Sequence, residues 1–137
     1  MNFSKTIDLL HRSLDAQTVR REVIANNLAN AEVKDFKRSE VNFESSLKKA
    51  LDSEKQKPVI ELKRTDPRHL SNYNPQNYQD VQPRRVLDYL TQTKNNNNNV
   101  DPETEINLLV ENQLMYQLLA QSAQFEFDQV NSVLRSS

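Results

Sequence analysis

Residues 102–134 read PETEINLLVENQLMYQLLAQSAQFEFDQVNSVL, and this stretch decides the fold class. It contains no glycine, and no proline after its first residue, so nothing interrupts a helix along its length. Apolar side chains recur at steps of three and four residues, which predicts one face of an α-helix about 50 Å long. The seam consists of Ile106, Leu109, Gln113, Tyr116, Ala120, Ala123, Phe127, Val130 and Leu134, with Gln113 as its polar interruption. A second apolar row, Leu114, Leu118 and Phe125, widens the stripe.

The start of this helix is marked by a cap sequence. Asp101 is expected to accept hydrogen bonds from free amides of the first turn, and Pro102 suits the first helical position. Glu103 and Glu105 complement the helix dipole.

Residues 1–31 predict a second heptad helix, from about residue 3 to 30. Its seam consists of Phe3, Ile7, Leu10, Leu14, Gln17, Arg21, Ile24, Leu28 and Ala31, in which Gln17 and Arg21 are polar. Two such seams suit a two-helix hairpin that packs on itself and equally suit packing on other chains, and the two arrangements are compatible.

The middle of the chain, residues 32–99, is expected to be irregular, and it contains four of the five prolines. We predict a short helix over 43–55 and one short strand over 59–62, followed by turns. The run Asn95–Asn99 predicts a flexible connection into the capped helix. The fold class is therefore mainly α, with a coiled-coil-like pair of terminal helices (1–31 and 100–137) around an irregular middle.

Composition excludes most catalytic chemistry. The 137 residues contain no glycine and no cysteine, which excludes glycine-rich phosphate loops, thiolate metal sites and cysteine nucleophiles. Of the two histidines, only His69 lies beside an acid and a base, Asp66 and Arg68, and hydrogen bonding within a loop is favoured over a small hydrolase site. We expect no cofactor, no metal and no enzyme.

Charge and hydropathy restrict the partners. The net charge is −1, so no nucleic-acid partner is expected. The aromatic and basic residues Tyr73, Tyr78, Arg84 and Arg85 favour a solvated or partner-facing loop over a stacking platform, because Asp80 and Asp88 lie among them. No apolar run is long enough for a membrane span or resembles a cleavable signal, so we expect neither membrane insertion nor a cleaved leader.

Three asparagines near the end of the first helix form the most specific motif. Asn26, Asn27 and Asn30 lie in Ala-Asn-Asn-Leu-Ala-Asn, residues 25–30. A helix end explains Asn30 alone. Three amides beside an apolar seam predict side-chain hydrogen bonds to a neighbouring element.

This motif and four other segments resemble the bacterial flagellar axial proteins, the components of the rod and hook. The other segments are Phe-Lys-Arg at 36–38, Leu-Lys-Arg-Thr-Asp-Pro-Arg-His-Leu at 62–70, Asn-Val-Asp at 99–101 with Glu105, and Glu-Asn-Gln-Leu-Met-Tyr-Gln at 111–117. The family usually has Thr-Pro-Gly-Tyr where this chain has Val33-Lys34-Asp35-Phe36. Asp35 therefore takes the glycine position, where aspartate can adopt a positive φ.

The resemblance implies a structural component of the proximal rod, which self-assembles through its terminal helices into the helical drive-shaft that transmits motor torque. It also implies export without a cleaved signal by the flagellar type III apparatus, and a place in the periplasmic part of the basal body. Implied partners are other copies of the chain, the rod proteins FlgC, FlgF and FlgG, and the adapter FliE with the MS ring behind it. The competing interpretation is a soluble coiled-coil adaptor unrelated to flagella.

We expect the assembly interface to include the seam residues and the asparagine motif. It consists of Ile7, Leu10, Leu14, Ile24, Asn26, Asn27, Leu28, Asn30, Ile106, Leu109, Gln113, Tyr116, Ala120, Ala123, Phe127, Val130 and Leu134.

Overall fold

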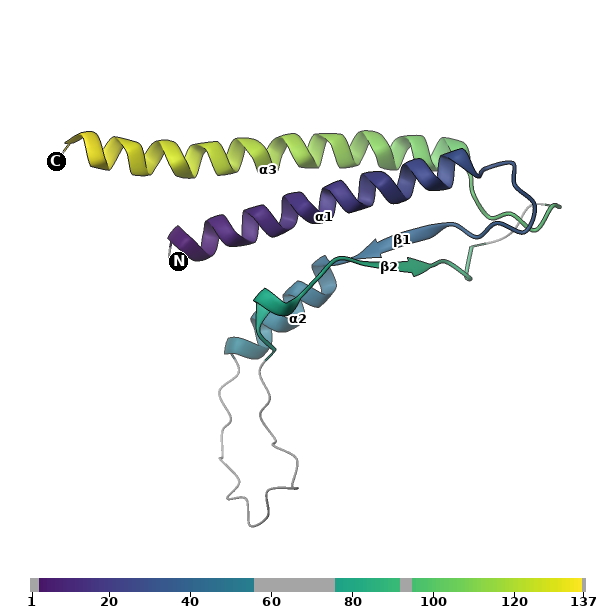
Figure 1. Ribbon diagram of the computed structural model, residues 1–137, viewed down its shortest axis with the longest axis horizontal. Helices are drawn as coiled ribbons and strands as arrows, with labels where there is room; N and C mark the ends of the chain where they lie inside the picture. The colour runs from purple at the N-terminus through teal and green to yellow at the C-terminus, as the bar shows by residue number, and fades with distance from the viewer. Residues whose placement is uncertain (1–2, 56–75, 92–94, 137) are drawn as a thin grey trace, which may run out of the picture. The chain divides into compact units, whose positions relative to one another are not determined.

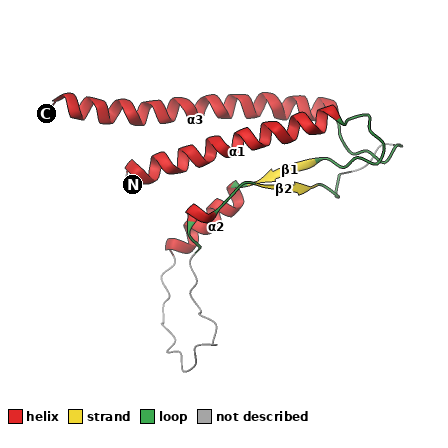
Figure 2. Cartoon of the chain, viewed as in Figure 1, coloured by secondary structure: helices red, strands yellow, loops and turns green. Residues whose placement is uncertain are grey.

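The computed structural model describes residues 3–55, 76–91 and 95–136. The elements in chain order are the helix α1 (Phe3–Ala29), the strand β1 (Ser39–Asn42), the helix α2 (Glu44–Lys55), the 3₁₀ turn η1 (Tyr78–Asp80), the strand β2 (Arg84–Leu87) and the helix α3 (Pro102–Ser136). Helix dominates, and the mainly α fold class is confirmed (Figure 2).

The chain divides into two compact units. One consists of Met1–Val41 with Arg85–Ser137 and contains α1 and α3; the other is Asn42–Arg84 and contains α2 and η1. In the second unit Phe43, Ala50 and Tyr78 are buried, and the carbonyl of Phe43 accepts the backbone N–H of Leu47 at 2.8 Å where α2 begins.

The two long helices run side by side in opposite directions (Figure 1). Three contacts between them fix this antiparallel register. Near one end Asn27 donates to Glu105, further along Asn112 donates to Gln17, and near the other end the rings of Phe3 and Phe127 meet edge to face with centroids 6.3 Å apart. The predicted packing of the terminal helices on each other is confirmed.

Helix α3 begins at the expected cap sequence. The carboxylate of Asp101 accepts the backbone N–H of Glu103 at 3.3 Å and the hydroxyl of Thr104 at 2.5 Å. Its carbonyl accepts the backbone N–H of Glu105 at 3.0 Å. The Asp101 side chain therefore supplies a partner for a first-turn amide, that of Glu103, which no helical carbonyl can satisfy.

A two-stranded sheet of β1 and β2 forms within a region expected to be irregular. The strands run in opposite directions, and the bond from Asp88 N to Arg38 O at 3.0 Å extends their pairing by one step (Figure 1). The strand expected at 59–62 lies outside the described residues. The short helix expected at 43–55 corresponds to α2.

The asparagine run is not the flexible connection that its composition predicts. Asn98 and Asn99 are 0% and 3% exposed. Asn98 donates to the carbonyls of Asn30 and Val33 at 2.9 and 2.7 Å, and its Oδ1 accepts the backbone N–H of Val100. An asparagine side chain carries both donors and an acceptor, so it can satisfy backbone groups of a helix end, which a count of polar residues does not reveal.

Candidate assembly interface

The face of α3 that meets α1 carries polar side chains at its centre. Glu105 and Asn112 are 0% and 4% exposed, and they lie seven residues apart on one side of the helix. Asn112 Nδ2 donates to Gln17 Oε1 at 2.6 Å and to the Gln17 carbonyl at 3.0 Å. Leu119 and Glu126, half-buried, continue the seven-residue row. The helix pair is thus aligned by hydrogen bonds as well as by apolar packing.

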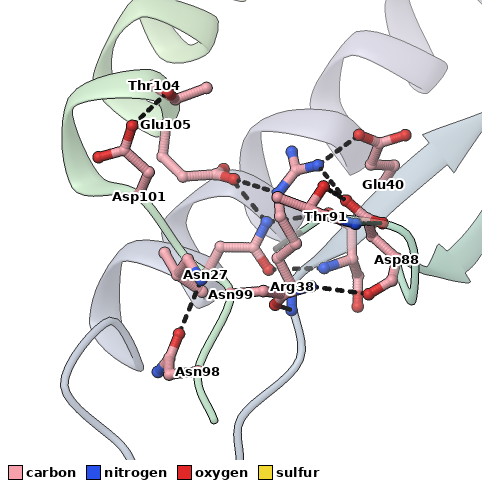
Figure 3. A network of polar contacts seen from close by, with 12 residues as sticks. Asn27, Arg38, Glu40, Asp88, Thr91, Asn98, Asn99, Asp101, Thr104 and Glu105 are labelled. Atoms are coloured by element: carbon pink, nitrogen blue, oxygen red, sulfur yellow. Dashed lines mark hydrogen bonds and ion pairs between the residues drawn. The ribbon is translucent and has the colours of Figure 1, made fainter. Parts of the chain in front are cut away.

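Arg38 joins this helix face to the end of the β-ribbon (Figure 3). Its Nε donates to Glu105 Oε1 at 2.8 Å, and its Nη1 donates to Asp88 Oδ2 at 2.9 Å and to Glu40. Burial alone would lower the pKa of Arg38, but hydrogen bonds to Glu105, Asp88 and Glu40 outweigh it and raise that pKa above its usual value. The guanidinium therefore holds carboxylates from three separate segments.

Asp88 also fixes the turn that follows β2. Its Oδ1 accepts the backbone N–H groups of Leu90 and Thr91 at 2.9 and 3.1 Å, and its Oδ2 accepts the Thr91 hydroxyl. The bond from Thr91 is the largest cause that lowers the pKa of Asp88 well below its usual range; burial opposes it, and the bonds from Arg38 and the two amides reinforce it. The ionised carboxylate is thus built into the turn.

Asn27 is the central residue of the asparagine motif. It is completely buried, its Oδ1 accepts from Ser39 N at 2.9 Å, and its Nδ2 donates to Ser39 O at 2.9 Å and to Glu105 at 3.1 Å. A single amide thus pairs with both backbone groups of a strand residue and with α3. Asn27 therefore makes the bonds to a neighbouring element that the motif predicts.

The other two asparagines of the motif have local roles. Asn26 is exposed and accepts from Arg85 at 3.0 Å, while Asn30 donates to the Asn26 carbonyl at 2.7 Å. The Asn30 side chain thus satisfies a backbone carbonyl at the end of α1, and the Asn26 side chain binds Arg85.

Asp35 has φ 61°, which confirms the positive φ expected at the family's glycine position. Asn97 has the same φ, and its Nδ2 donates to Asp35 Oδ1 at 2.9 Å. The backbone N–H of Asp35 donates to the carbonyl of Asn96 at 3.0 Å. The turn after the motif is therefore held by the asparagine run.

The structure distributes the predicted interface residues over three environments. Ile24 and Asn27 are buried. The half-buried members are Ile7, Leu10, Leu14, Leu28, Asn30, Leu109, Ala123 and Val130. The exposed members are Asn26, Ile106, Gln113, Tyr116, Ala120, Phe127 and Leu134. The seam of α3 thus lies at the edge of the contact with α1, with much of its apolar surface left accessible.

A second apolar surface lies on the side of α3 that faces away from α1. It consists of Ile106, Val110, Leu114, Leu118 and Phe125, which are 52%, 55%, 62%, 58% and 62% exposed. We call this set the outer row. At about 100° per residue Val110, Leu114, Leu118 and Phe125 lie roughly opposite Glu105 and Asn112, and Ile106 lies at the flank of this face. Leu114, Leu118 and Phe125, predicted to widen the apolar stripe of this helix, lie on its exposed side together with Ile106 and Val110.

A groove of about 240 Å³ opens beside Arg38. Its apolar lining comes from α1, β1 and α3, and its polar lining comes from α1, from β1 and from Arg38, the residue before β1. The lining residues are Arg20, Val23, Ile24, Arg38, Ser39, Glu40, Val41 and Leu108.

Within the residues that the structure describes, no three histidine, cysteine or acidic side chains form a group able to hold a metal. His69, Asp66 and Arg68 lie outside the described residues. Among the helices described, none is long and apolar enough to cross a membrane.

Comparison with known proteins decides the family. The chain is 40% identical over 134 residues to the flagellar basal body rod protein FlgB of Borreliella burgdorferi, with 98% of each chain covered. The chain belongs to the FlgB family. It is also 39% identical to FlgB of Borrelia hermsii, with 97% of this chain and 98% of that one covered, and 32% identical to FlgB of Bacillus subtilis, with 96% and 95% covered. No family model matches the chain.

Membership in the FlgB family makes the chain a component of the flagellar basal body rod. The resemblance to flagellar axial proteins is therefore confirmed, and an adaptor unrelated to flagella is excluded. The family name is that of a structural component rather than an enzyme. For such a component the functional site is the surface through which it meets its neighbours.

Proposed function

We propose that this FlgB-family chain assembles with copies of itself through α1 and α3 into the helical shaft of the proximal rod, and that the shaft transmits motor torque. The single observation that carries the proposal is the outer row. Five large apolar side chains on one helix face, each more than half exposed, form the kind of contiguous patch that marks an interaction site.

The charge pattern of α3 supports a copy of the same chain as the occupant. Residues 102–134 contain five acids and no lysine or arginine, whereas residues 1–99 carry a net positive charge. An acidic, apolar helix face therefore complements the rest of the same chain. Contacts between unlike surfaces of identical subunits build an open filament when the rotation does not close.

The helix pair is also suited to carrying shear. The bonds from Asn27 to Glu105 and from Asn112 to Gln17 join α1 and α3 at two separated points. Sliding one helix along the other would break both and leave buried polar groups without partners. A rigid antiparallel pair can therefore pass force along its axis.

The remaining assignments rest on the family. We propose contacts with FlgC, FlgF and FlgG, attachment through FliE to the MS ring, export by the type III apparatus without a cleaved signal, and a place in the periplasmic rod. The sequence-derived interface, together with the outer row, is the proposed assembly surface.

The test is a double substitution in the outer row, Leu114→Glu with Leu118→Glu. Both side chains are exposed in the monomer, so we expect an unchanged helical circular-dichroism spectrum and melting temperature, with loss of assembly in sedimentation and of motility in cells. Leu114→Met with Leu118→Met keeps the apolar surface and should assemble normally. Filament formation by the glutamate variant at the wild-type rate would show that the outer row is not the contact.

A further inference from the structure

The edge of β1 that points away from β2 is closed by side chains of α1. Asn27 Oδ1 accepts from Ser39 N and Asn27 Nδ2 donates to Ser39 O, both at 2.9 Å. Arg20 Nη2 donates to the Val41 carbonyl at 3.5 Å. Backbone groups of successive strand residues point alternately to the two edges, so Ser39 and Val41 share this edge. No further strand can add on this side of the ribbon without displacing α1.

The opposite edge, that of β2, is open. The bond from Asp88 N to Arg38 O joins the two strands, so the backbone groups of Asp88 point toward β1. By the same alternation Val86 points toward β1 as well, whereas the N–H and C=O groups of Arg85 and Leu87 point outward. Among the residues that the structure describes, none bonds to these four groups. They form a template for one more strand.

The side chains along this edge are only half covered. Val86 and Leu87 are 48% and 47% exposed, and successive side chains lie on opposite faces of a strand. Each face of the ribbon therefore carries a large apolar side chain at its open edge. A two-stranded ribbon on its own is marginally stable in water, and a third strand would cover both side chains as a cross-strand neighbour.

The charge of the edge indicates what the third strand carries. Arg84 and Arg85, the first two residues of β2, are both exposed. Arg85 donates to a neutral side-chain amide at 3.0 Å, and neither arginine is paired with a carboxylate within the described ranges. The acids of the ribbon, Glu40 and Asp88, are already bonded to Arg38. Opposite charges stabilise a strand pair, so acids are favoured opposite the two free arginines.

The β2 edge of a second copy does not supply these acids. It presents the same two arginines, and its own Asp88 is held by Arg38 and by the amides of the turn that follows. The complement is therefore a segment of a different protein.

We propose that the outer edge of β2 binds an extended segment of a partner protein, which adds to the ribbon as a third, antiparallel strand. Antiparallel addition lets Arg85 and Leu87 each exchange one N–H and one C=O hydrogen bond with the segment. Two apolar residues of the segment then lie opposite Leu87 and Val86, and two acids follow opposite the arginines. The recognised chemistry is an extended sequence of two apolar residues followed by two acids.

Amide hydrogen exchange with a synthetic peptide tests the added strand. The probe is acetyl-Thr-Val-Val-Glu-Glu-Thr-amide, and the control is acetyl-Thr-Glu-Glu-Val-Val-Thr-amide, which has the same composition in reverse order. In excess probe, exchange at Arg85 N and Leu87 N should slow roughly fivefold or more, the usual effect of one hydrogen bond. Exchange at Val86 N, which faces β1, should not change. Equal slowing by both peptides, slowing at all three amides, or slowing at none would overturn the proposal.

Proline substitution separates the open edge from the rest of the ribbon. Leu87→Pro removes an outward N–H and no bond to β1, so the melting temperature should be kept while peptide binding is lost. Val86→Pro is the comparison, because it removes a bond to β1 and should lower the melting temperature. Peptide binding that persists in Leu87→Pro, or equal destabilisation by the two prolines, would contradict the open edge.

Charge reversal tests the preference for acids without touching the backbone. Arg84→Glu with Arg85→Glu changes two exposed side chains, so the helical circular-dichroism spectrum should be kept. This variant should no longer bind the probe and should bind acetyl-Thr-Val-Val-Lys-Lys-Thr-amide instead. Unchanged binding of the acidic probe would refute the role of the arginines.

The edge site does not depend on the proposed self-assembly. The variant Leu114→Glu with Leu118→Glu should bind the probe as the natural chain does, whatever its effect on assembly. Leu87→Pro should assemble normally. Loss of assembly in Leu87→Pro would show that a second copy occupies the edge, and would overturn the assignment to a partner protein.

Discussion

The two sides of α3 invert the usual arrangement of an amphipathic helix. The side against α1 holds Glu105 and Asn112, both buried and hydrogen-bonded. The side away from α1 carries the outer row, more than half exposed. Polar contacts are directional, so they define which residues of the two helices align, while apolar contacts adapt more readily to a partner. The chain therefore uses directional bonds within itself and leaves an apolar surface of α3 exposed.

The largest expected effect comes from breaking the charged contact on the inner side. Arg38→Met leaves Glu105 buried without its cationic partner, which typically costs about 3–5 kcal/mol in free energy of unfolding. Urea denaturation measures the loss. Asp15→Asn is the control, because its partner His11 is exposed and such pairs contribute about 0–1 kcal/mol.

A second variant shows whether the Arg38–Glu105 ion pair is needed for the stability of the fold or only for the alignment of its segments. Arg38→Met with Glu105→Leu removes both charges and should recover much of the lost stability. Asp88 and Glu40 also lose a partner in both variants, so recovery should be incomplete. No recovery at all would mean that Glu105 contributes independently of Arg38.

Alanine on each side of α3 compares the two faces directly. Asn112→Ala should lower the free energy of unfolding by about 1–3 kcal/mol, because buried acceptors of Gln17 lose their donor. Leu114→Ala on the outer row should change it by about 0.5 kcal/mol or less. The ranking should reverse in an assembly assay, where Leu114→Ala weakens filament formation more. A larger loss of monomer stability at Leu114 would break the comparison.

The smallest expected effect is that of acid pH on the free energy of unfolding, because the contribution of Asp88 is already complete near neutral pH. The pKa of Asp88 is lowered in the folded chain, so the unfolded chain takes up the proton first as the pH falls. The contribution of Asp88 is complete above the ordinary aspartate pKa of about 4 and declines below it. Urea midpoints at pH 6, 4 and 3 should fall less steeply in Asp88→Asn than in the natural chain; parallel slopes would exclude this contribution.

The sequence predicts where the helices lie better than it predicts which side of each helix is buried. An uninterrupted three-and-four periodicity and the cap at Asp101 were sufficient for α3. The polar centre of the helix contact was not predicted, because periodicity does not show that Glu105 and Asn112 each have a partner from a distant segment, Asn27 or Gln17. Seven-residue spacing of these two polar positions was the available signal.

The ribbon and the Asp88 turn were harder to foresee. β1 and β2 are four residues each and are separated by more than forty residues, so local pattern carries little information on their pairing. Asp88 depends on Arg38, fifty positions away. Interactions of this range are set by the folded chain as a whole.

The positive φ angles of Asp35 and Asn97 have a consequence for the unfolded chain. Each residue adopts a backbone conformation that glycine would adopt without steric penalty. Glycine at these positions would also enlarge the set of conformations open to the denatured ensemble. A chain that contains no glycine has correspondingly less conformational entropy to lose when it folds. The steric cost of the positive φ angles at Asp35 and Asn97 is thus offset by a smaller conformational entropy of the unfolded chain. This contribution to stability does not come from any contact in the folded state.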